Sequence, residues 1–192
     1  MKLSPDTTDE DLLALYAKGT PDAAAELTHR VLPRVFRHAV RMLGDRSEAE
    51  DIAQEAMLRL WRIAPVWRRG EAKVSTWLYR VTANLCTDQL RKRRTVGLSE
   101  IDEPLDDAPG AVEGLQDRAR TEALQRALDR LPERQRAAVV LRHLEGLSNP
   151  EIADIMHISP RAVESLTARG KSALAALLSG RREELGYEDA TD

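Results

Sequence analysis

Hydrophobic residues recur at helical spacing through residues 1–94, with few prolines or glycines between them. The clearest case covers residues 22–43, where Leu27, Val31 and Val35 lie one helical turn apart. Pro33 interrupts this segment, so we expect a kink there or two separate helices. Three more helices are predicted in this half: one around residues 12–16 that ends near Gly19, one from a cap at Asp45 or Ser47 to Pro65, and one from a cap at Ser75 or Thr76 to Arg94.

The helical pattern is lost between residues 95 and 114, where prolines and glycines stand among acidic residues. It resumes at about Asp117, and helices are predicted at about 117–131, 132–144, 149–156 and 160–178. No segment alternates between apolar and polar residues in the manner of a strand. We therefore predict an all-α fold of two helical domains, at residues 1–94 and 118–180, joined by an acidic flexible linker at 95–117 and followed by an acidic tail at 181–192.

Charge divides the chain into blocks that its net charge of −3 conceals. Residues 61–94 hold 9 basic and 2 acidic residues, a charge of +7, whereas residues 95–117 hold 7 acidic residues and no basic one. Residues 118–180, with 10 basic and 7 acidic residues, carry +3. Because binding to a polyanion needs only a local positive face, the acidic total does not exclude DNA as a partner.

Several classes of function are disfavoured by what the sequence lacks. No apolar run reaches the roughly 20 residues that span a bilayer, and the polar start of the chain does not resemble a signal peptide. The single cysteine, Cys86, fits a reducing cytoplasm and is expected to be buried. The four histidines lack metal-ligand spacing and there is no glycine-rich phosphate loop, so we expect no enzyme, no metal and no cofactor.

Residues 147–166 predict two short helices joined by a tight turn. Ser148 is the expected cap of the first helix, whose inner face is Ile152, Ile155 and Met156. Ser159 before Pro160 is a typical start for the second, which keeps basic side chains on its outer face. The pattern indicates a helix-turn-helix, with a plain helical hairpin as the alternative.

Two further runs carry a resemblance to known families. The turn and second helix, I-S-P-R-A-V-E-S-L, resemble those of sigma domain four and of response-regulator DNA-binding domains. The preceding run L-P-E-R-Q-R-A-A-V-V-L-R, at residues 131–142, resembles the opening of the sigma module. The chain departs from the family pattern at Asn149 and Pro150, and at Glu164, where a basic residue is more usual.

The basic block also contains all three tryptophans of the chain. Trp61 and Trp77 are expected to pack in the core, whereas Trp67 stands in a loop beside arginines and is expected to be more open. On the helix that follows, a polar stripe of Arg80, Asn84, Thr87 and Arg91 recurs at helical spacing. Arginines contact phosphates, Asn and Thr can read base edges, and a Trp-bearing loop can hold an unstacked base. We hypothesise that this block binds DNA as it opens; the alternative is an aromatic core under a solvated face.

The first half of the chain resembles one group of proteins in particular. The runs D-R-S-E-A-E-D-I-A-Q-E-A-M-L-R-L-W and S-T-W-L-Y-R-V-T-A-N-L resemble domain two of the extracytoplasmic-function (ECF) group of sigma-70 factors. The order of domain two, linker and domain four also resembles that group, over roughly residues 23–178.

The resemblance implies a role for each matching segment. It implies that the helix at residues 45–63 docks on core RNA polymerase through Asp51, Gln54, Glu55 and Arg59. It implies that a loop and helix read and melt the −10 element, with these DNA-binding residues: Trp67, Arg68, Arg69, Lys73, Ser75, Thr76, Arg80, Asn84, Thr87, Arg91 and Arg94. It implies that the last helix reads the −35 element through Ser159, Arg161, Ala162, Ser165, Arg169 and Lys171.

The implied function is that of an RNA polymerase sigma factor without a catalytic site. Its partners would be core polymerase, promoter DNA and an anti-sigma factor. The acidic linker would either mimic a nucleic acid in a basic channel or act as a solubilising tether. The alternative function is a stand-alone helix-turn-helix regulator of the response-regulator type, which would need a domain of alternating strands and helices ahead of the linker.

Overall fold

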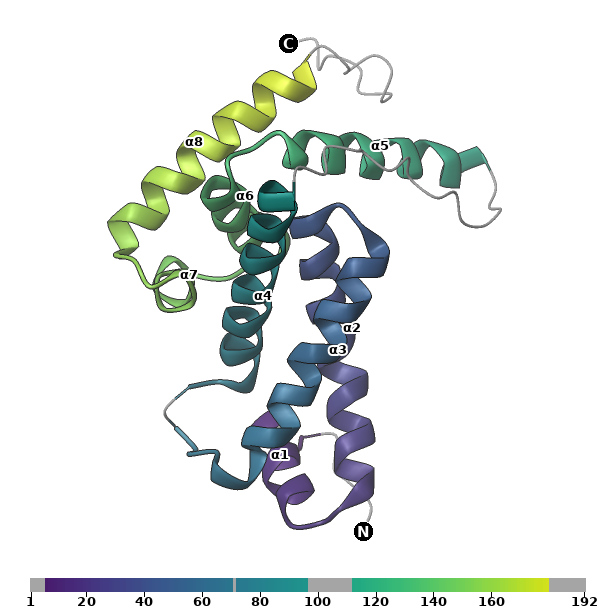
Figure 1. The fold of residues 1–192 in the computed structure, drawn as a ribbon, viewed down its shortest axis with the longest axis vertical. Coiled ribbons are helices and arrows are strands. Elements are labelled where there is room, and N and C mark those ends of the chain that lie inside the picture. Colours follow the sequence, from purple (N-terminus) through teal and green to yellow (C-terminus); the bar gives the residue numbers. More distant parts are fainter. Residues whose placement is uncertain (1–5, 71, 97–111, 180–192) are drawn as a thin grey trace. The chain divides into compact units, whose positions relative to one another are not determined.

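The computed structural model describes residues 6–70, 72–96 and 112–179 of the 192-residue chain. Within these ranges all regular structure is helical, which confirms the predicted fold class. The chain forms two compact units, one made essentially of the residues up to Lys92 and the other of those that follow (Figure 1). The core of the predicted acidic linker, residues 97–111, lies outside the described residues, as does the predicted tail beyond Ser179.

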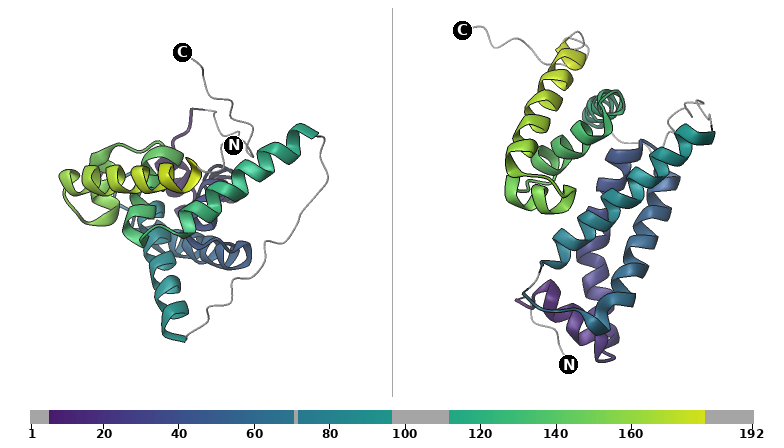
Figure 2. Two further views of the ribbon diagram at one scale, coloured as in Figure 1. Left: turned by 90° about the horizontal axis from the view of Figure 1, so that it is seen from above. Right: turned by 60° about the vertical axis from the view of Figure 1, so that its left-hand side comes forward.

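The first unit is a bundle of four helices, and Figure 2 shows the three long ones side by side. Its elements are α1 (Asp9–Ala17), α2 (Pro21–Leu43), α3 (Arg46–Ile63), the short 3-10 helix η1 (Ala64–Val66) and α4 (Val74–Val96). Pro33 lies inside one unbroken α2, so the alternative of two helices was wrong. The buried side chains of Val31 and Val35 hold both sides of Pro33 on the core, and such packing can outweigh the roughly 3 kcal/mol that an internal proline costs.

The starts of the helices are fixed by capping contacts. Asp45 accepts a hydrogen bond from the Glu48 amide at 2.8 Å, which identifies Asp45 rather than Ser47 as the cap of α3. The expected cap of the next helix at Ser75 or Thr76 was wrong, because α4 already begins at Val74. The amide of Val74 donates instead to the Glu10 carboxylate, at 3.3 Å. A carboxylate at this helix end also suits the helix dipole.

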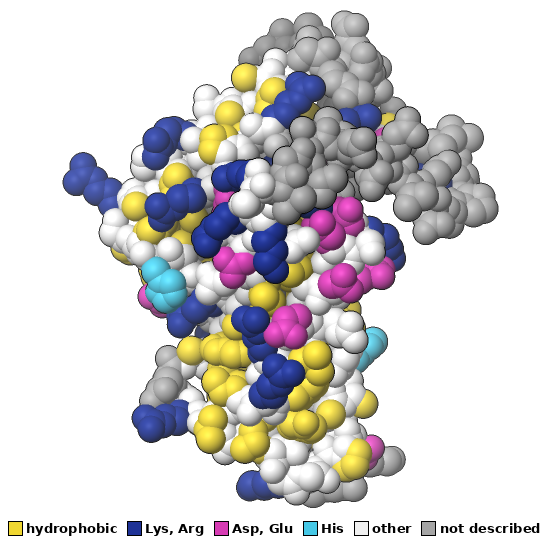
Figure 3. Space-filling model, in the orientation of Figure 1, with side chains coloured by type: hydrophobic (Ala, Val, Ile, Leu, Met, Phe, Trp, Pro, Cys, Tyr) yellow, Lys and Arg dark blue, Asp and Glu magenta, His cyan; other side chains and the backbone are white. Residues whose placement is uncertain are grey.

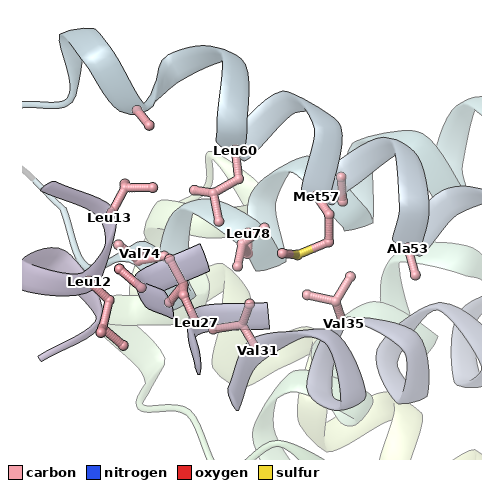
Figure 4. Close-up of a cluster of buried hydrophobic side chains, with 13 residues drawn as sticks. Leu12, Leu13, Leu27, Val31, Val35, Ala53, Met57, Leu60, Val74 and Leu78 are labelled. Carbon is pink, nitrogen blue, oxygen red and sulfur yellow. The ribbon is translucent and has the colours of Figure 1, made fainter. Parts of the chain in front are cut away.

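The core of the first unit draws aliphatic side chains from all four helices (Figure 4). Leu12, Leu27, Leu60 and Leu78 are each at most 1 % exposed, and burying such a side chain stabilises the fold by about 1.5–3 kcal/mol. Cys86 is buried, as predicted. His38 is also fully buried, edge-on to the Tyr79 ring at 5.4 Å between centroids. Burial, with a smaller effect of Arg41, lowers the pKa of His38 to about 3, so the folded protein holds this ring neutral.

The second unit contains α5 (Val112–Asp129), α6 (Glu133–Val139), the π-helical turn η2 (Val140–Leu144), α7 (Asn149–Met156) and α8 (Pro160–Ser179). The bounds of α7 and α8 agree with the prediction to within one residue. The expected start of α5 at Asp117 was wrong, since the helix begins at Val112. A glycine inside a helix costs only about 1 kcal/mol relative to alanine, so Gly114 did not end it.

Two close contacts join helices of this unit, in addition to an apolar cluster of Leu128, Leu131, Val139 and Val140. Arg136 is only 6 % exposed, and its guanidinium reaches the Asp129 carboxylate at 3.1 Å and the Asp129 carbonyl at 2.6 Å, which ties the end of α5 to α6. Gly170 of α8 lies directly against α6. A Cβ there would meet the Val139 Cγ2 atom at 2.6 Å and the Gln135 carbonyl oxygen at 3.1 Å, so the two helices pack closer than a side chain would allow.

Candidate nucleic-acid interface

A cavity of about 380 Å³ lies between the loop after α3 and the first turns of α4. The rings of Trp67 and Trp77 meet edge to face in its wall, 6.0 Å apart between centroids. Its lining combines apolar and basic residues: Ile63, Val66, Trp67, Arg68, Ala72, Trp77 and Arg80. Figure 3 shows hydrophobic and basic side chains gathered on the first unit in the lower part of the view.

Trp67 is less open than its place in a loop suggested. All three tryptophans are half-buried and pack against the edge of the core. Trp61 contacts Tyr16, with 4.5 Å between ring centroids, whereas Trp67 and Trp77 contact each other. The side chain of Trp67 is therefore held in place as a wall of the cavity, with the arginines after it exposed.

Two hydrogen-bond donors of this cavity wall are buried without a partner. The indole Nε1 of Trp67 and the Nε of Arg80 are both inaccessible and have no hydrogen-bond partner among the described residues. Leaving a buried donor unpaired costs about 1–3 kcal/mol, and such groups are rare in folded proteins. Both residues line the cavity, but these two atoms are closed off from it, so a ligand with acceptor atoms would reach them only after the side chains turn.

Helix α1 supports the loop that lines this cavity. The Arg69 guanidinium lies 2.8 Å from the Asp11 carboxylate. Asp11 also forms a reciprocal capping box with Thr8, and hydrogen bonding to Thr8, with a smaller effect of Arg69, lowers the pKa of Asp11. Together with the bond from the Val74 amide to Glu10, these contacts tie both sides of the loop to one end of α1.

The predicted −10 residues do not all face the same way. Arg68, Arg69, Lys73, Asn84, Arg91 and Arg94 are exposed, and Trp67, Arg80 and Thr87 are half-buried. Thr76 is buried in the first turn of α4, at 9 % exposure. Ser75 lies with Val31 and Val35 in the lining of a separate small cavity against α2. We therefore do not assign a DNA contact to Ser75 or Thr76.

The helix-turn-helix is built as its capping residues predicted. Ser148 and Glu151 form a capping box at the start of α7, with the Ser148 hydroxyl donating to the Glu151 carboxylate at 2.7 Å. The Ser159 hydroxyl accepts from the Ala162 amide at 3.2 Å and caps α8. His157, in the turn between them, takes a left-handed φ of 52°. This is a conformation that non-glycine residues rarely adopt.

The predicted −35 residues lie mainly on the outer face of α8. Arg161, Ser165, Arg169 and Lys171 are exposed, whereas Val163 is buried. Ala162 is half-buried, and the hydroxyl of Ser159 is engaged in its cap. The side-chain amide nitrogen Nδ2 of Asn149, at the start of α7, donates to the Glu164 carboxylate on α8 at 3.4 Å. The sequence marked these two residues as unusual but gave no sign that they meet.

The outer face of α3 carries the residues predicted to dock on polymerase. Asp51, Gln54 and Arg59 are exposed, and Arg59 pairs with Glu55 at 2.7 Å. Leu58, which the sequence reasoning missed, lies among them and is 43 % exposed. Its signal was its position: Leu58 lies one helical turn from Gln54 and falls opposite the buried stripe of α3.

In the described part of the chain, no group of three or more His, Cys, Asp or Glu side chains is placed to hold a metal ion. None of the helices described has both the length and the apolar character needed to cross a membrane.

Two family models match the chain. Residues 27–96 match sigma-70 region 2, and residues 121–174 match sigma-70 region 4. The first match covers most of α2, all of α3 and α4 and the tryptophan cavity, and the second covers the helix-turn-helix as far as residue 174 of α8.

Full-length relatives agree with both matches. The ECF RNA polymerase sigma factor SigM of Mycobacterium tuberculosis is 36 % identical over 176 residues, covering 89 % of this chain and 85 % of SigM. SigE of Mycolicibacterium smegmatis is 34 % identical over 92 % of this chain and 72 % of its own length. SigW of Bacillus subtilis is 31 % identical over 82 % of this chain and 89 % of its own.

Solved structures show the same fold. CnrH, in complex with the cytosolic domain of CnrY, has a TM-score of 0.67 at 24 % identity, covering 90 % of this chain and 97 % of CnrH. The sigma factor RpoE of Bartonella quintana, in complex with the anti-sigma factor NepR, has a TM-score of 0.66 at 24 % identity, covering 81 % of this chain and 96 % of RpoE.

A response regulator would need strands ahead of the helix-turn-helix, and residues 6–70 and 72–96 are helical wherever their structure is regular. The match to region 2 in that same part, the match to region 4 behind it and the full-length relatives lead to one assignment. The chain belongs to the ECF group of the sigma-70 family and is an RNA polymerase sigma factor.

Proposed function

We propose that this sigma factor grips a promoter in two physically different ways. The first unit holds an unstacked base of the −10 element in the tryptophan cavity, beside the basic face of α4. The second unit reads the −35 element as a duplex, with α8 in the major groove. The observation that carries the proposal is the cavity itself, whose wall combines the rings of Trp67 and Trp77 with the basic side chains of Arg68 and Arg80.

A nucleobase meets the requirements of this cavity. The volume of about 380 Å³ falls in the range of small-ligand pockets, roughly 300–1,000 Å³. The rings of Trp67 and Trp77 offer aromatic surface, and base stacking on an aromatic side chain is worth about 1–3 kcal/mol. The ring nitrogens and carbonyls of a base are acceptors for Trp67 Nε1 and Arg80 Nε once these side chains turn their donors toward the cavity. Arg68, Arg69 and Arg91 supply charge for the neighbouring phosphates.

The outer face of α3 is proposed as the docking site for core polymerase. Leu58 provides an apolar centre, and Asp51, Gln54 and the Glu55–Arg59 pair surround it with polar groups. An apolar anchor within a polar rim is the usual anatomy of a protein interface. Replacing Leu58 by alanine should weaken binding to core polymerase roughly 10-fold, the effect of losing about 1.5 kcal/mol of apolar burial.

Control by an anti-sigma factor is the regulation we propose. RpoE, similar in fold, was solved in complex with such a factor, and the DNA-facing residues of this chain are exposed enough for a partner to cover them. The protein then acts as a binding subunit in the cytoplasm, and the proposal requires no catalytic group, metal or cofactor of its own.

The test of the cavity needs a promoter, which can be found by sequencing transcript starts made from genomic DNA by core polymerase and this protein. On that promoter, Trp67→Phe keeps an aromatic wall but removes the N–H group. We expect open-complex formation, followed by permanganate reactivity of unpaired thymines, to slow roughly 5- to 100-fold, because the acceptor of the base is left unpaired. Closed-complex affinity should remain within about 2-fold.

The matched control is Trp61→Phe, which makes the same chemical change in a half-buried ring outside the cavity lining. It should leave both steps nearly unchanged. Equal losses of binding and opening in Trp67→Phe would show that Trp67 only supports the fold, and the base would have to be placed elsewhere.

A further inference from the structure

Glu164 is an acidic side chain on the outer face of the helix that we assign to the −35 element. At about 100° per residue, the exposed side chains of α8 after Pro160 fall on one arc of roughly 160°. They are Arg161, Glu164, Ser165, Ala168, Arg169, Lys171, Ser172, Ala175, Ala176 and Ser179. Glu164 is the one acidic residue between Pro160 and Ser179, where three basic residues supply positive charge. It therefore lies among the groups that would face DNA.

The structure gives Glu164 a neutral partner rather than a cation. Among the described residues Glu164 forms no ion pair. The side-chain nitrogen Nδ2 of Asn149 donates a hydrogen bond to the Glu164 oxygen Oε1 at 3.4 Å. Asn149 is the first residue of α7, directly after the Ser148 cap, so its backbone is fixed. The amide thus restrains the Glu164 side chain while leaving its charge and its second oxygen available.

A carboxylate near DNA is repelled by phosphates, so its favourable contacts are with hydrogen-bond donors on the bases. In the major groove the donors are the amino groups of cytosine N4 and adenine N6. Adenine presents its acceptor N7 beside that amino group, which a carboxylate would also meet, whereas cytosine offers only the donor. The chemistry of the side chain therefore favours cytosine.

We propose that Glu164 selects a cytosine within the −35 element by accepting a hydrogen bond from its N4 amino group, and that Asn149 is the positioning residue. Asn149 and Glu164, which both depart from the family pattern, then act together to select one base of the −35 element. This inference rests on the proposed function of α8 as the −35 reader.

The experiment uses the full chain with core polymerase on a promoter library randomised across the −35 element, with transcripts counted by sequencing. The wild type should favour cytosine at one position by roughly 5- to 100-fold, the usual range for one good base contact. Glu164→Gln should lose that preference and shift it toward adenine, which glutamine reads through N6 and N7. Asn149→Ala should weaken the same preference by a smaller factor, and the other positions should not change in either variant.

Asp154→Asn is the matched control, since it removes one exposed negative charge from α7 rather than from α8. If Glu164→Gln and Asp154→Asn both raise the use of all sequences alike, Glu164 acts only by repelling phosphates and the inference is overturned. A wild-type preference elsewhere in the element, with no position responding to Glu164→Gln, also overturns it while leaving the −35 role of α8 intact. No −35 preference in the wild type would overturn that role as well.

Discussion

The two helices that we assign to promoter DNA, α4 and α8, are held in place by different means. Helix α4 packs its apolar side chains into a core that it shares with α1, α2 and α3. Its first residue, Val74, also donates a backbone hydrogen bond to the Glu10 carboxylate. Helix α8 contributes Ala173 and Leu174 to a smaller apolar cluster and also brings its backbone close to α6 at Gly170. The larger core of the first unit allows an open cavity at its edge, whereas the second unit combines a small core with one very close helix contact.

The side chains proposed to contact DNA also differ between the two units in how far they are exposed. Trp67 and Arg80 are half-buried and line a cavity, which suits a single base taken out of the duplex. Arg161, Ser165 and Arg169 project from an exposed helix face, which suits the groove of an intact duplex. This difference fits the proposed division of melting and duplex reading between the two units.

The largest effect is expected at the contact that positions α8. Gly170→Ala places a methyl group against the Val139 side chain and the Gln135 carbonyl, so the second unit should lose about 2–3 kcal/mol of stability, although alanine alone favours a helix. Amide hydrogen exchange in α6 and α8 measures this, because all three tryptophans lie in the first unit. Ala175→Gly, at an exposed position of the same helix, is the control: it should cost about 1 kcal/mol, which is the difference in helix propensity between alanine and glycine without any change in packing. Unchanged exchange in Gly170→Ala would contradict the close packing.

An effect of similar size is expected in the first unit at low pH. His38 has a folded pKa of about 3 against an ordinary 6.5, so below pH 6.5 the unfolded chain binds a proton that the folded chain excludes. Stability should therefore fall as the pH drops from 6.5 toward 3, by about 2 kcal/mol at pH 5. Urea unfolding followed by tryptophan fluorescence at pH 7.5 and pH 5 measures it. His38→Met should remove this part of the pH dependence and His29→Gln, an exposed neighbour on α2, should not; equal slopes for wild type and His38→Met would refute the assignment.

A smaller effect, of opposite sign, is expected in the turn of the helix-turn-helix. His157 holds a left-handed φ of 52° after the end of α7, where glycine has no steric penalty. His157→Gly should therefore stabilise the second unit by about 0.5–1 kcal/mol, seen as slower amide exchange in α7 and α8. His143→Gly, at an exposed helical position, should destabilise it instead, and a loss of stability in both variants would rule out strain at His157.

The smallest effect is expected where α1 caps α4. Glu10→Gln keeps the shape of the side chain but removes its charge from the start of α4, and should cost the first unit about 0.5 kcal/mol. The loss should shrink at 1 M salt, where charges are screened. Tryptophan fluorescence in urea provides the measurement, with Asp51→Asn, exposed on α3, as the control for removing one acidic charge. A loss that is independent of salt would argue against an electrostatic cap.

Many local features could be predicted because they depend on neighbouring residues. Asp45, Ser148 and Ser159 cap their helices, and α7 and α8 have the expected bounds, because a cap and an apolar stripe involve residues a few positions apart. The start of α4 failed for the opposite reason. Its partner is Glu10, 64 positions earlier, and no local pattern announces such a contact.

The sequence by itself determined the helical class, the helix-turn-helix and the family, since these are written in periodicity and short motifs. Only the tertiary structure decided that Trp67 and Arg80 share a cavity, that Leu58 is exposed, that Glu164 meets Asn149 and that Gly170 lies against α6. The physical reason is that helices determine which side chains share a face, but the packing of one helix on another determines which faces meet, which donors lose their partners and where a methyl group no longer fits.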